Sequence, residues 1–233
     1  MQKELSRLTL LLALVLAAPL SIACDEAPDA MMNAVTAEVM SILRHDKDLQ
    51  AGSPAKVAEL IETRIQPLFD FARMTRIAAA RSWRLATPEQ QSMLTAEFKT
   101  LLVRTYFVAL ANYRDQAIEF KRLRMAPGDT VVKVKSEVSQ PGRERIAIDY
   151  DMERTGADWK IYDIKVGGVS LIATYRETFA EAVRDEGLDG LIKSLSDKNR
   201  QASAAIKPAR TTFWDQTRLM FAMLQSALQG RRQ

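Results

Sequence analysis

The sequence predicts an α+β fold, in which helices pack on one face of an antiparallel sheet of about four strands. Two features of the sequence support this prediction. Apolar residues recur at three- and four-residue spacing up to about residue 113, and then at two-residue spacing between residues 118 and 166. Helical spacing returns after residue 170. Helices and strands are thus segregated along the chain, whereas a parallel sheet requires them to alternate.

The first two helices are expected over residues 30–43 and between Pro54 and Pro67. The first has an apolar stripe at helical spacing, made by Met32, Val35, Val39, Ile42 and Leu43. At the start of the second, Ser53 is expected to cap the helix and Pro54 to take its first position. Pro67 is expected to end it.

Two further helix starts are recognisable downstream. Asp70 is placed to cap a short helix that runs to Ala79. Thr87 and Gln90 have the spacing of a capping box, which predicts a long helix that ends near Tyr113.

Four strands are expected over residues 118–125, 132–138, 146–152 and 159–166. In the second and third, apolar residues alternate with charged ones, which is typical of strands with one buried face. Turn signals separate the strands at residues 127–129, 141–142 and 156–158. The last strand has apolar residues at both parities, which predicts that it is central or covered on both sides.

Helices are expected again over residues 170–186 and 189–195, on either side of a Gly-Leu-Asp-Gly break at Gly187. Residues 197–210 are polar and are interpreted as a linker. Beyond them, one helix face between Phe213 and Leu228 is apolar. The expected organisation is therefore a domain over residues 24–196, followed by a basic linker and an amphipathic helix over residues 197–233.

The first 23 residues have the pattern of a secretory signal peptide. Lys3 and Arg7 precede an uncharged apolar run, and Ser21-Ile22-Ala23 is a small-x-small cleavage signature. We therefore expect export to the periplasm. Cys24 follows the expected cut and is the single cysteine, so a disulfide within the chain is excluded. Plain secretion and acylation of Cys24 as a lipoprotein both remain open.

Charge is unevenly distributed along the chain. The net charge is +4, but residues 198–233 contribute +6 and residues 1–23 contribute +1, which leaves −3 for residues 24–197. The basic residues of the tail therefore account for the basic pI of the chain, about 9.2. The body of the protein does not have the charge of a nucleic-acid-binding domain.

Signatures of enzymes, metal sites and cofactors are scarce in this sequence. The single histidine, His45, lies at the polar end of the first expected helix, where a solvated helix end explains it. Asp149 and Asp151 share one strand face and have the spacing of paired carboxylates. The apolar residues that alternate with them are expected to face the core, however, so we favour the interpretation that both aspartates lie on the solvent-exposed face of the strand. The sequence indicates neither an enzyme nor a bound cofactor.

Three segments together resemble the MlaC family of periplasmic phospholipid-binding proteins. They are Phe69 to Trp83, Thr87 to Gln90, and the run from Trp159 to Leu195, which contains W-x-x-Y-D, G-V-S and G-x-D-G-L in that order. The resemblance covers roughly residues 30–196. The family usually has Glu where this chain has Gly167, and its members generally end near the position of Leu195.

The resemblance implies a phospholipid carrier with a lipid cavity between the sheet and the helices, in which the acyl chains lie while the head group faces solvent. The residues expected to line it are Tyr106, Phe107, Leu110, Val132, Val134, Ile146, Ile148, Tyr150, Trp159, Ile161, Val169 and Ile172. Without the resemblance, plain core explains the same residues better than a ligand cavity does. The implied partners are a phospholipid, an inner-membrane MCE-domain ABC transporter complex and an outer-membrane lipoprotein-porin complex.

The segment Gly167-Gly168-Val169-Ser170 has two interpretations. As a tight turn, its glycines permit positive φ and Ser170 caps the following helix. As a binding element, the helix start offers free N–H groups to a lipid phosphate.

Two further alternatives remain open at this level. The tail helix either contacts anionic membranes peripherally or packs on the domain. The chain as a whole is a carrier of phospholipids, a carrier of hopanoid-like lipids, or a cavity-free docking subunit of an envelope lipid-transport complex.

Overall fold

The computed structural model describes residues 26–51, 53–107, 117–139, 141–142 and 144–204 of the 233-residue chain. The expected signal peptide, Cys24, Leu110, Tyr113 and the tail helix from Phe213 to Leu228 lie outside the described residues. None of the described helices combines the length and apolar character needed to cross a membrane.

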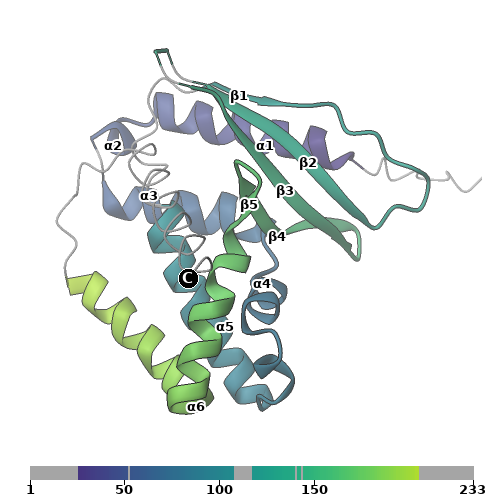
Figure 1. Ribbon diagram of the computed structural model, residues 1–233. Coiled ribbons are helices and arrows are strands. Elements are labelled where there is room, and N and C mark those ends of the chain that lie inside the picture. Colours follow the sequence, from purple (N-terminus) through teal and green to yellow (C-terminus); the bar gives the residue numbers. More distant parts are fainter. Residues whose placement is uncertain (1–25, 52, 108–116, 140, 143, 205–233) are drawn as a thin grey trace, which may run out of the picture.

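The fold is α+β, as predicted, with the helices grouped against a five-stranded antiparallel sheet in the order β1-β2-β3-β4-β5 (Figure 1). The strands are β1 (Ala117–Phe120), β2 (Val131–Ser139), β3 (Ile146–Thr155), β4 (Asp158–Val166) and β5 (Val169–Ser170). The α-helices are α1 (Pro28–His45), α2 (Lys47–Gln50), α3 (Pro54–Leu60), α4 (Phe71–Ala79), α5 (Pro88–Leu102) and α6 (Leu171–Ala204). Short π- or 3₁₀-helical segments are η1 (Ile61–Ile65), η2 (Gln66–Leu68), η3 (Ser82–Arg84) and η4 (Val103–Phe107).

Local capping explains where several helices begin. The Asp70 carboxylate accepts a hydrogen bond from the Arg73 N–H at 2.8 Å, and Thr87 and Gln90 form both bonds of the predicted capping box, at 3.0 and 3.2 Å. The predicted cap at Ser53 is wrong in one respect. Ser53 occupies the position before α3, but its hydroxyl makes no capping bond. Pro54 starts that helix through its restricted φ instead.

The sheet buries one face, which we call the inner face. On β2 the even-numbered residues from Val132 to Val138 are buried, while the odd-numbered residues from Val131 to Lys135 are exposed. The sheet has five strands and not four, because the chain turns at Gly167 and Gly168, with φ of 56° and 83°, and Val169–Ser170 pairs back on β4. Both glycines have positive φ, which residues with a Cβ rarely adopt.

A β-bulge in β4 explains why this strand has apolar residues at both parities. Asp151 of β3 pairs with Asp163, whereas Met152 pairs with Ile161, so Tyr162 is an extra residue in β4. Such an insertion shifts the alternation of side chains by one position. Ile161 and Ile164 therefore pack in the same inner-face cluster although three positions separate them. β4 lies inside the strand order, as expected, with β5 and a bridge from Phe69 along its second edge.

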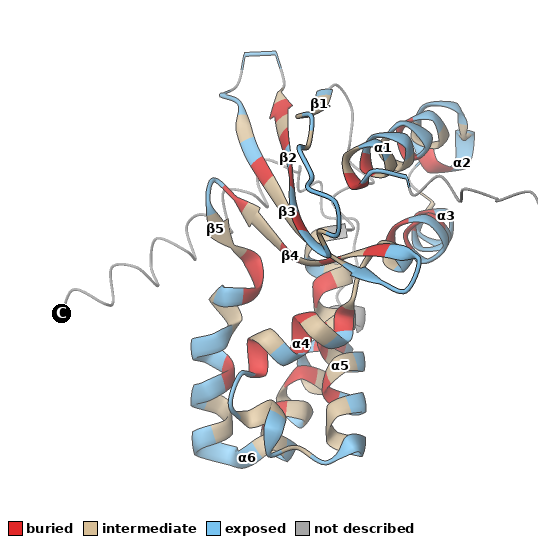
Figure 2. Cartoon of the chain, turned by 90° about the vertical axis from the view of Figure 1, so that its right-hand side faces the viewer, coloured by how far each residue is buried: buried red, intermediate tan, exposed pale blue. Residues whose placement is uncertain are grey.

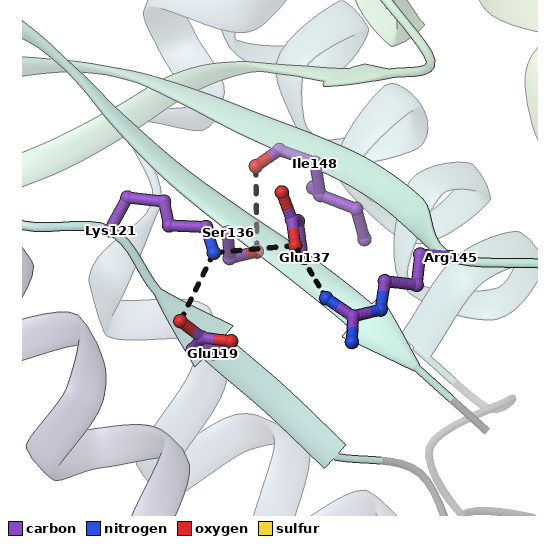
Figure 3. A network of polar contacts seen from close by, with 6 residues as sticks. All are labelled: Glu119, Lys121, Ser136, Glu137, Arg145 and Ile148. Carbon is purple, nitrogen blue, oxygen red and sulfur yellow. Dashed lines mark hydrogen bonds and ion pairs between the residues drawn. The ribbon is translucent and has the colours of Figure 1, made fainter. Parts of the chain in front are cut away.

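The opposite side of the sheet, which we call the outer face, carries a network of ion pairs. Lys121 bridges Glu119 and Glu137 at 3.0 and 3.3 Å, and Arg145 also contacts Glu137 (Figure 3). Asp149 and Asp151, the paired carboxylates of the sequence, take part in the same kind of contact. Lys133 lies 3.9 and 3.7 Å from them, and Lys165 lies 2.6 Å from Asp151. This arrangement agrees with their interpretation as the outward side of a half-buried strand.

Three apolar clusters hold the helices against the inner face. The largest joins α4, α5 and α6, where the ring of Phe98 meets the edges of Phe179 and Tyr175 at 5.0 and 4.9 Å. A second joins α1, α2, α3 and η1. In the third, Met32 of α1 covers the inner-face residues of β2, β3 and β4. Figure 2 shows buried positions on α1, on the strands and where α4, α5 and α6 meet.

The end of the domain differs from the prediction. α6 breaks at Gly187, as expected, where φ is 72°. Residues 197–204, expected as linker, instead continue α6. Asn199 is buried there, and its amide donates to the Glu97 carbonyl at 2.9 Å and to the Glu97 carboxylate at 2.7 Å. Arg104 in turn donates to the Asn199 carbonyl. Contacts with α5, which lies about 100 residues earlier, hold this helix end in place.

Candidate functional site

The predicted lining residues separate into two groups in the structure. Six are buried, namely Val132, Val134, Ile148, Trp159, Ile161 and Ile172. Four are half-buried, namely Tyr106, Ile146, Tyr150 and Val169. Leu110 and the side chain of Phe107 lie outside what the structure describes. An apolar side chain that remains half-exposed beside a packed cluster is available to a ligand, so the half-buried group is the stronger candidate.

Ile146 and Tyr150 lie on the inner face of the sheet, Val169 lies in β5, and Tyr106 lies in the helical segment η4. Tyr106, Ile146 and Val169 pack against the cluster of α4, α5 and α6, whereas Tyr150 packs against the cluster beneath α1. Ile164, which the prediction omitted, packs against both. The bulge at Tyr162 turns Ile164 to this side. Apolar residues at both parities of this strand are the sequence signal of the bulge, but a central or doubly covered strand explains the same pattern.

A pair of tyrosine hydroxyls lies on the helical side of this region. The hydroxyl of Tyr106, in η4, is 3.2 Å from that of Tyr175, in the second turn of α6. Burial raises the pKa of both phenols, so both are neutral near pH 7. Tyr175 was also missed by the sequence prediction. Its spacing from Ile172 and Phe179, three and four residues, is the signal that would have found it.

The sheet contributes two more hydroxyls at its inner face. Ser136 is 2% exposed between Val134 and Val138, and its hydroxyl lies 3.4 Å from the Ile148 carbonyl (Figure 3). Burial raises the pKa of Tyr150, while its hydrogen bond with Ser136 lowers it. The Tyr150 ring packs on Phe120 at 6.0 Å. The region is thus apolar, with a few neutral hydroxyl groups.

The carboxylate of Asp163, in β4, contacts the start of α6 and bears on the two interpretations of the glycine turn. This carboxylate accepts from the Ile172 N–H at 3.2 Å and from the Ser170 hydroxyl at 2.6 Å, and Ser170 caps the Ala173 N–H at 2.9 Å. The turn interpretation is confirmed. The phosphate interpretation is not favoured, because the Ile172 and Ala173 N–H groups are already bonded and a carboxylate at the same helix end repels an anion. Burial raises the pKa of Asp163, and hydrogen bonds from Ser170 and Ile172 lower it.

The structure of the described residues also bears on catalysis by histidine and on metal binding. His45 is exposed at the end of α1, where its Nδ1 lies 2.7 Å from the Ser41 carbonyl oxygen. Among the described residues, no group of three or more His, Cys, Asp or Glu side chains is arranged to hold a metal ion.

The chain is also similar to known proteins. The chain matches the family described as "MlaC protein" over residues 33–197. It is 26% identical over 180 residues to the toluene tolerance protein ttg2D of Pseudomonas putida, covering 77% of this chain and 83% of that protein. It is 19% identical over 204 residues to the intermembrane phospholipid transport system binding protein MlaC of Haemophilus influenzae, covering 86% and 95%.

A solved structure is similar as well. It is the phospholipid-binding protein from Ralstonia solanacearum, determined in complex with a phospholipid at 1.53 Å resolution. The two share 39% identity with a TM-score of 0.69, over 76% of this chain and 99% of that one. From the fold, the ordered motifs and these matches together, we conclude that this chain belongs to the MlaC family.

Proposed function

We propose that the protein is a periplasmic carrier that binds a phospholipid and shuttles it between the inner and outer membranes. The observation that carries the proposal is the similarity, at 39% identity, to a protein solved in complex with a phospholipid. The acyl chains would lie at the inner face of the sheet, against the half-buried side chains of Tyr106, Ile146, Tyr150 and Val169.

The physical need for a carrier follows from the cost of exposing hydrocarbon to water. Each exposed methylene costs about 0.8 kcal/mol, so two chains of roughly 15 methylenes cost on the order of 24 kcal/mol. An apolar protein site replaces the membrane interior during transit. No bond is made or broken in this process, so the proposed role is not enzymatic.

The remaining parts of the proposal concern the compartment and the partners. Residues 1–23 would direct export to the periplasm, with or without acylation of Cys24. An inner-membrane MCE-domain ABC transporter complex and an outer-membrane lipoprotein-porin complex would exchange lipid with the carrier. The family resemblance supports both partners.

The cargo test is mass spectrometry of protein purified without added lipid. We expect co-purified diacyl phospholipid at close to one molecule per chain. A polycyclic lipid in its place would identify a hopanoid carrier. Folded, never delipidated protein that carries no lipid would contradict the carrier function and favour a docking subunit.

A substitution at Ile146 tests where the lipid lies. Ile146 is half-buried at the inner face, so we expect Ile146→Trp to fill space needed by an acyl chain and to lower lipid occupancy several-fold with little loss of stability. Ile148 is less suitable, since it is only 7% exposed and overpacking a buried site costs about 1–3 kcal/mol. Ala147→Trp, on the exposed outer side of the same strand, is the matched control. Equal occupancy in the two variants would exclude this position.

A further inference from the structure

The Tyr106–Tyr175 pair has a hydrogen-bonding capacity that no other group among the described residues uses. Each phenol has one proton to donate, and the single hydrogen bond between the two hydroxyls consumes one of the two protons. Within the described part of the chain, neither hydroxyl has another protein partner. One O–H therefore has no protein acceptor among the described residues, and it lies at a half-buried, largely apolar position that an acceptor group of a ligand can reach.

The surrounding structure holds the pair in place. Tyr175 packs edge-on against Phe98 at 4.9 Å and lies 5.9 Å from the ring of Phe179. Tyr106 lies in η4, and Arg104 of the same segment donates a hydrogen bond to the Asn199 carbonyl near the end of α6. The two tyrosines are 69 residues apart in the sequence, since Tyr106 lies in η4, which follows α5, and Tyr175 lies in the second turn of α6, which follows β5. The free O–H thus has a fixed position beside the proposed lipid site.

The chemistry of the pair selects the kind of acceptor it fits. A diacyl phospholipid offers two kinds of acceptor, the charged phosphate and the neutral ester carbonyls. Burial raises the pKa of both phenols, so the pair is a neutral donor. A phosphate buried against a neutral pair would lack a counter-charge, whereas a carbonyl requires only a hydrogen bond.

We propose that the Tyr106–Tyr175 hydroxyl pair donates a hydrogen bond to an acyl ester carbonyl of the bound lipid, and that the protein therefore prefers ester-linked to ether-linked lipids. This inference rests on the proposed function. It specifies the chemical class of the cargo, independently of its head group.

The test is a competition between two lipids that differ only in this linkage. Full-length protein is equilibrated with vesicles that contain equal amounts of diacyl and dialkyl phosphatidylglycerol of matched chain length, and the bound lipids are quantified by mass spectrometry. The wild type is expected to retain the ester lipid about three- to tenfold over the ether lipid, the range of one net hydrogen bond. The double variant Tyr106→Phe/Tyr175→Phe is expected to retain both equally.

The single variants sharpen the test. Each leaves one hydroxyl whose proton is no longer shared, so at least one of Tyr106→Phe and Tyr175→Phe is expected to keep the ester preference. Tyr162→Phe is the matched control, because its ring lies under the Arg73 guanidinium, 3.9 Å from the ring centroid, on the bulge of β4. This variant should behave as wild type.

Two results overturn the inference. They are a wild type that retains both lipids equally, and a folded double variant that keeps the preference. Either result leaves lipid carriage standing, whereas retention of neither lipid by the wild type contradicts the proposed function itself. Should the double variant not fold, infrared spectra of the wild type with carbonyl-labelled lipid decide the question. A hydrogen-bonded ester carbonyl absorbs at lower frequency than one in a hydrocarbon solvent, and an unshifted band would also overturn the inference.

Discussion

At the scale of single residues, Asp163 connects the family motif to the geometry of the fold. It is the last residue of the W-x-x-Y-D motif, and it is 7% exposed where β4 meets the start of α6. Its carboxylate accepts from Ser170 and Ile172, and Asp151 lies nearby as a like charge. A helix start that the sequence attributes to Ser170 alone is thus shared with a residue of the preceding strand.

The raised pKa of Asp163 predicts a pH dependence of stability. An unfolded Asp titrates at about 3.9. Because burial raises the folded value, the contribution of Asp163 to stability is fully present below that pH and is lost as the pH rises through the raised pKa. We expect Asp163→Asn, whose amide oxygen can still accept from Ile172, to remove this component of the slope without lowering stability at pH 7. Urea unfolding at a series of pH values measures it, with Asp149→Asn on the outer face as the control. An unchanged slope in Asp163→Asn would contradict the assignment.

At the scale of elements, the last two turns of α6 belong to the folded domain. Asn199 joins them to α5 through two hydrogen bonds to Glu97, and Arg104 donates to its carbonyl. We expect Asn199→Ala to lower the free energy of unfolding by about 1–3 kcal/mol, since the amide is buried and its partners lose a donor. Arg200→Ala, on the exposed side of the same turn, should change stability by less than about 0.5 kcal/mol. Urea midpoints at constant m-value measure both. Equal stability of the two variants would mean that the folded domain ends near residue 196.

At the scale of the whole molecule, the basic charge is concentrated in the C-terminal part of the sequence. Residues 205–233 have a net charge of +4, and the apolar stripe from Phe213 to Leu228 is on this segment. We expect a chain truncated after Ala204 to keep its lipid cargo but to bind anionic vesicles less than the full chain. The binding of the full chain should weaken as salt rises, because the Debye length falls from about 10 Å at 0.1 M to about 3 Å at 1 M. Vesicle sedimentation, with zwitterionic vesicles as the control, measures this. Equal sedimentation of the two chains would exclude the tail as a membrane contact.

The sequence by itself determined the features that depend on neighbouring residues. The capping box at Thr87, the cap at Asp70, the break at Gly187 and the alternation of β2 and β3 were all predictable, because hydrogen bonds and side-chain periodicity within a few residues produce them. The ordered motifs also identified the family. The candidate site was predicted in part, since periodicity selects the inner face of a strand but does not distinguish buried from half-buried positions along it.

The tertiary structure decided the features that join distant segments. The bulge at Tyr162 turns Ile164 inward, and the Asp163 carboxylate contacts the start of α6. Asn199 forms hydrogen bonds that join α6 to α5. Tyr106 and Tyr175, which are 69 residues apart in the sequence, are in contact through their hydroxyls. Each of these depends on strand register or helix packing, which is fixed by the whole set of contacts and not by any local window of sequence. The physical reason is that local patterns specify which face of an element is apolar, whereas the depth of a side chain and the partner of its polar group are set only when the elements pack together.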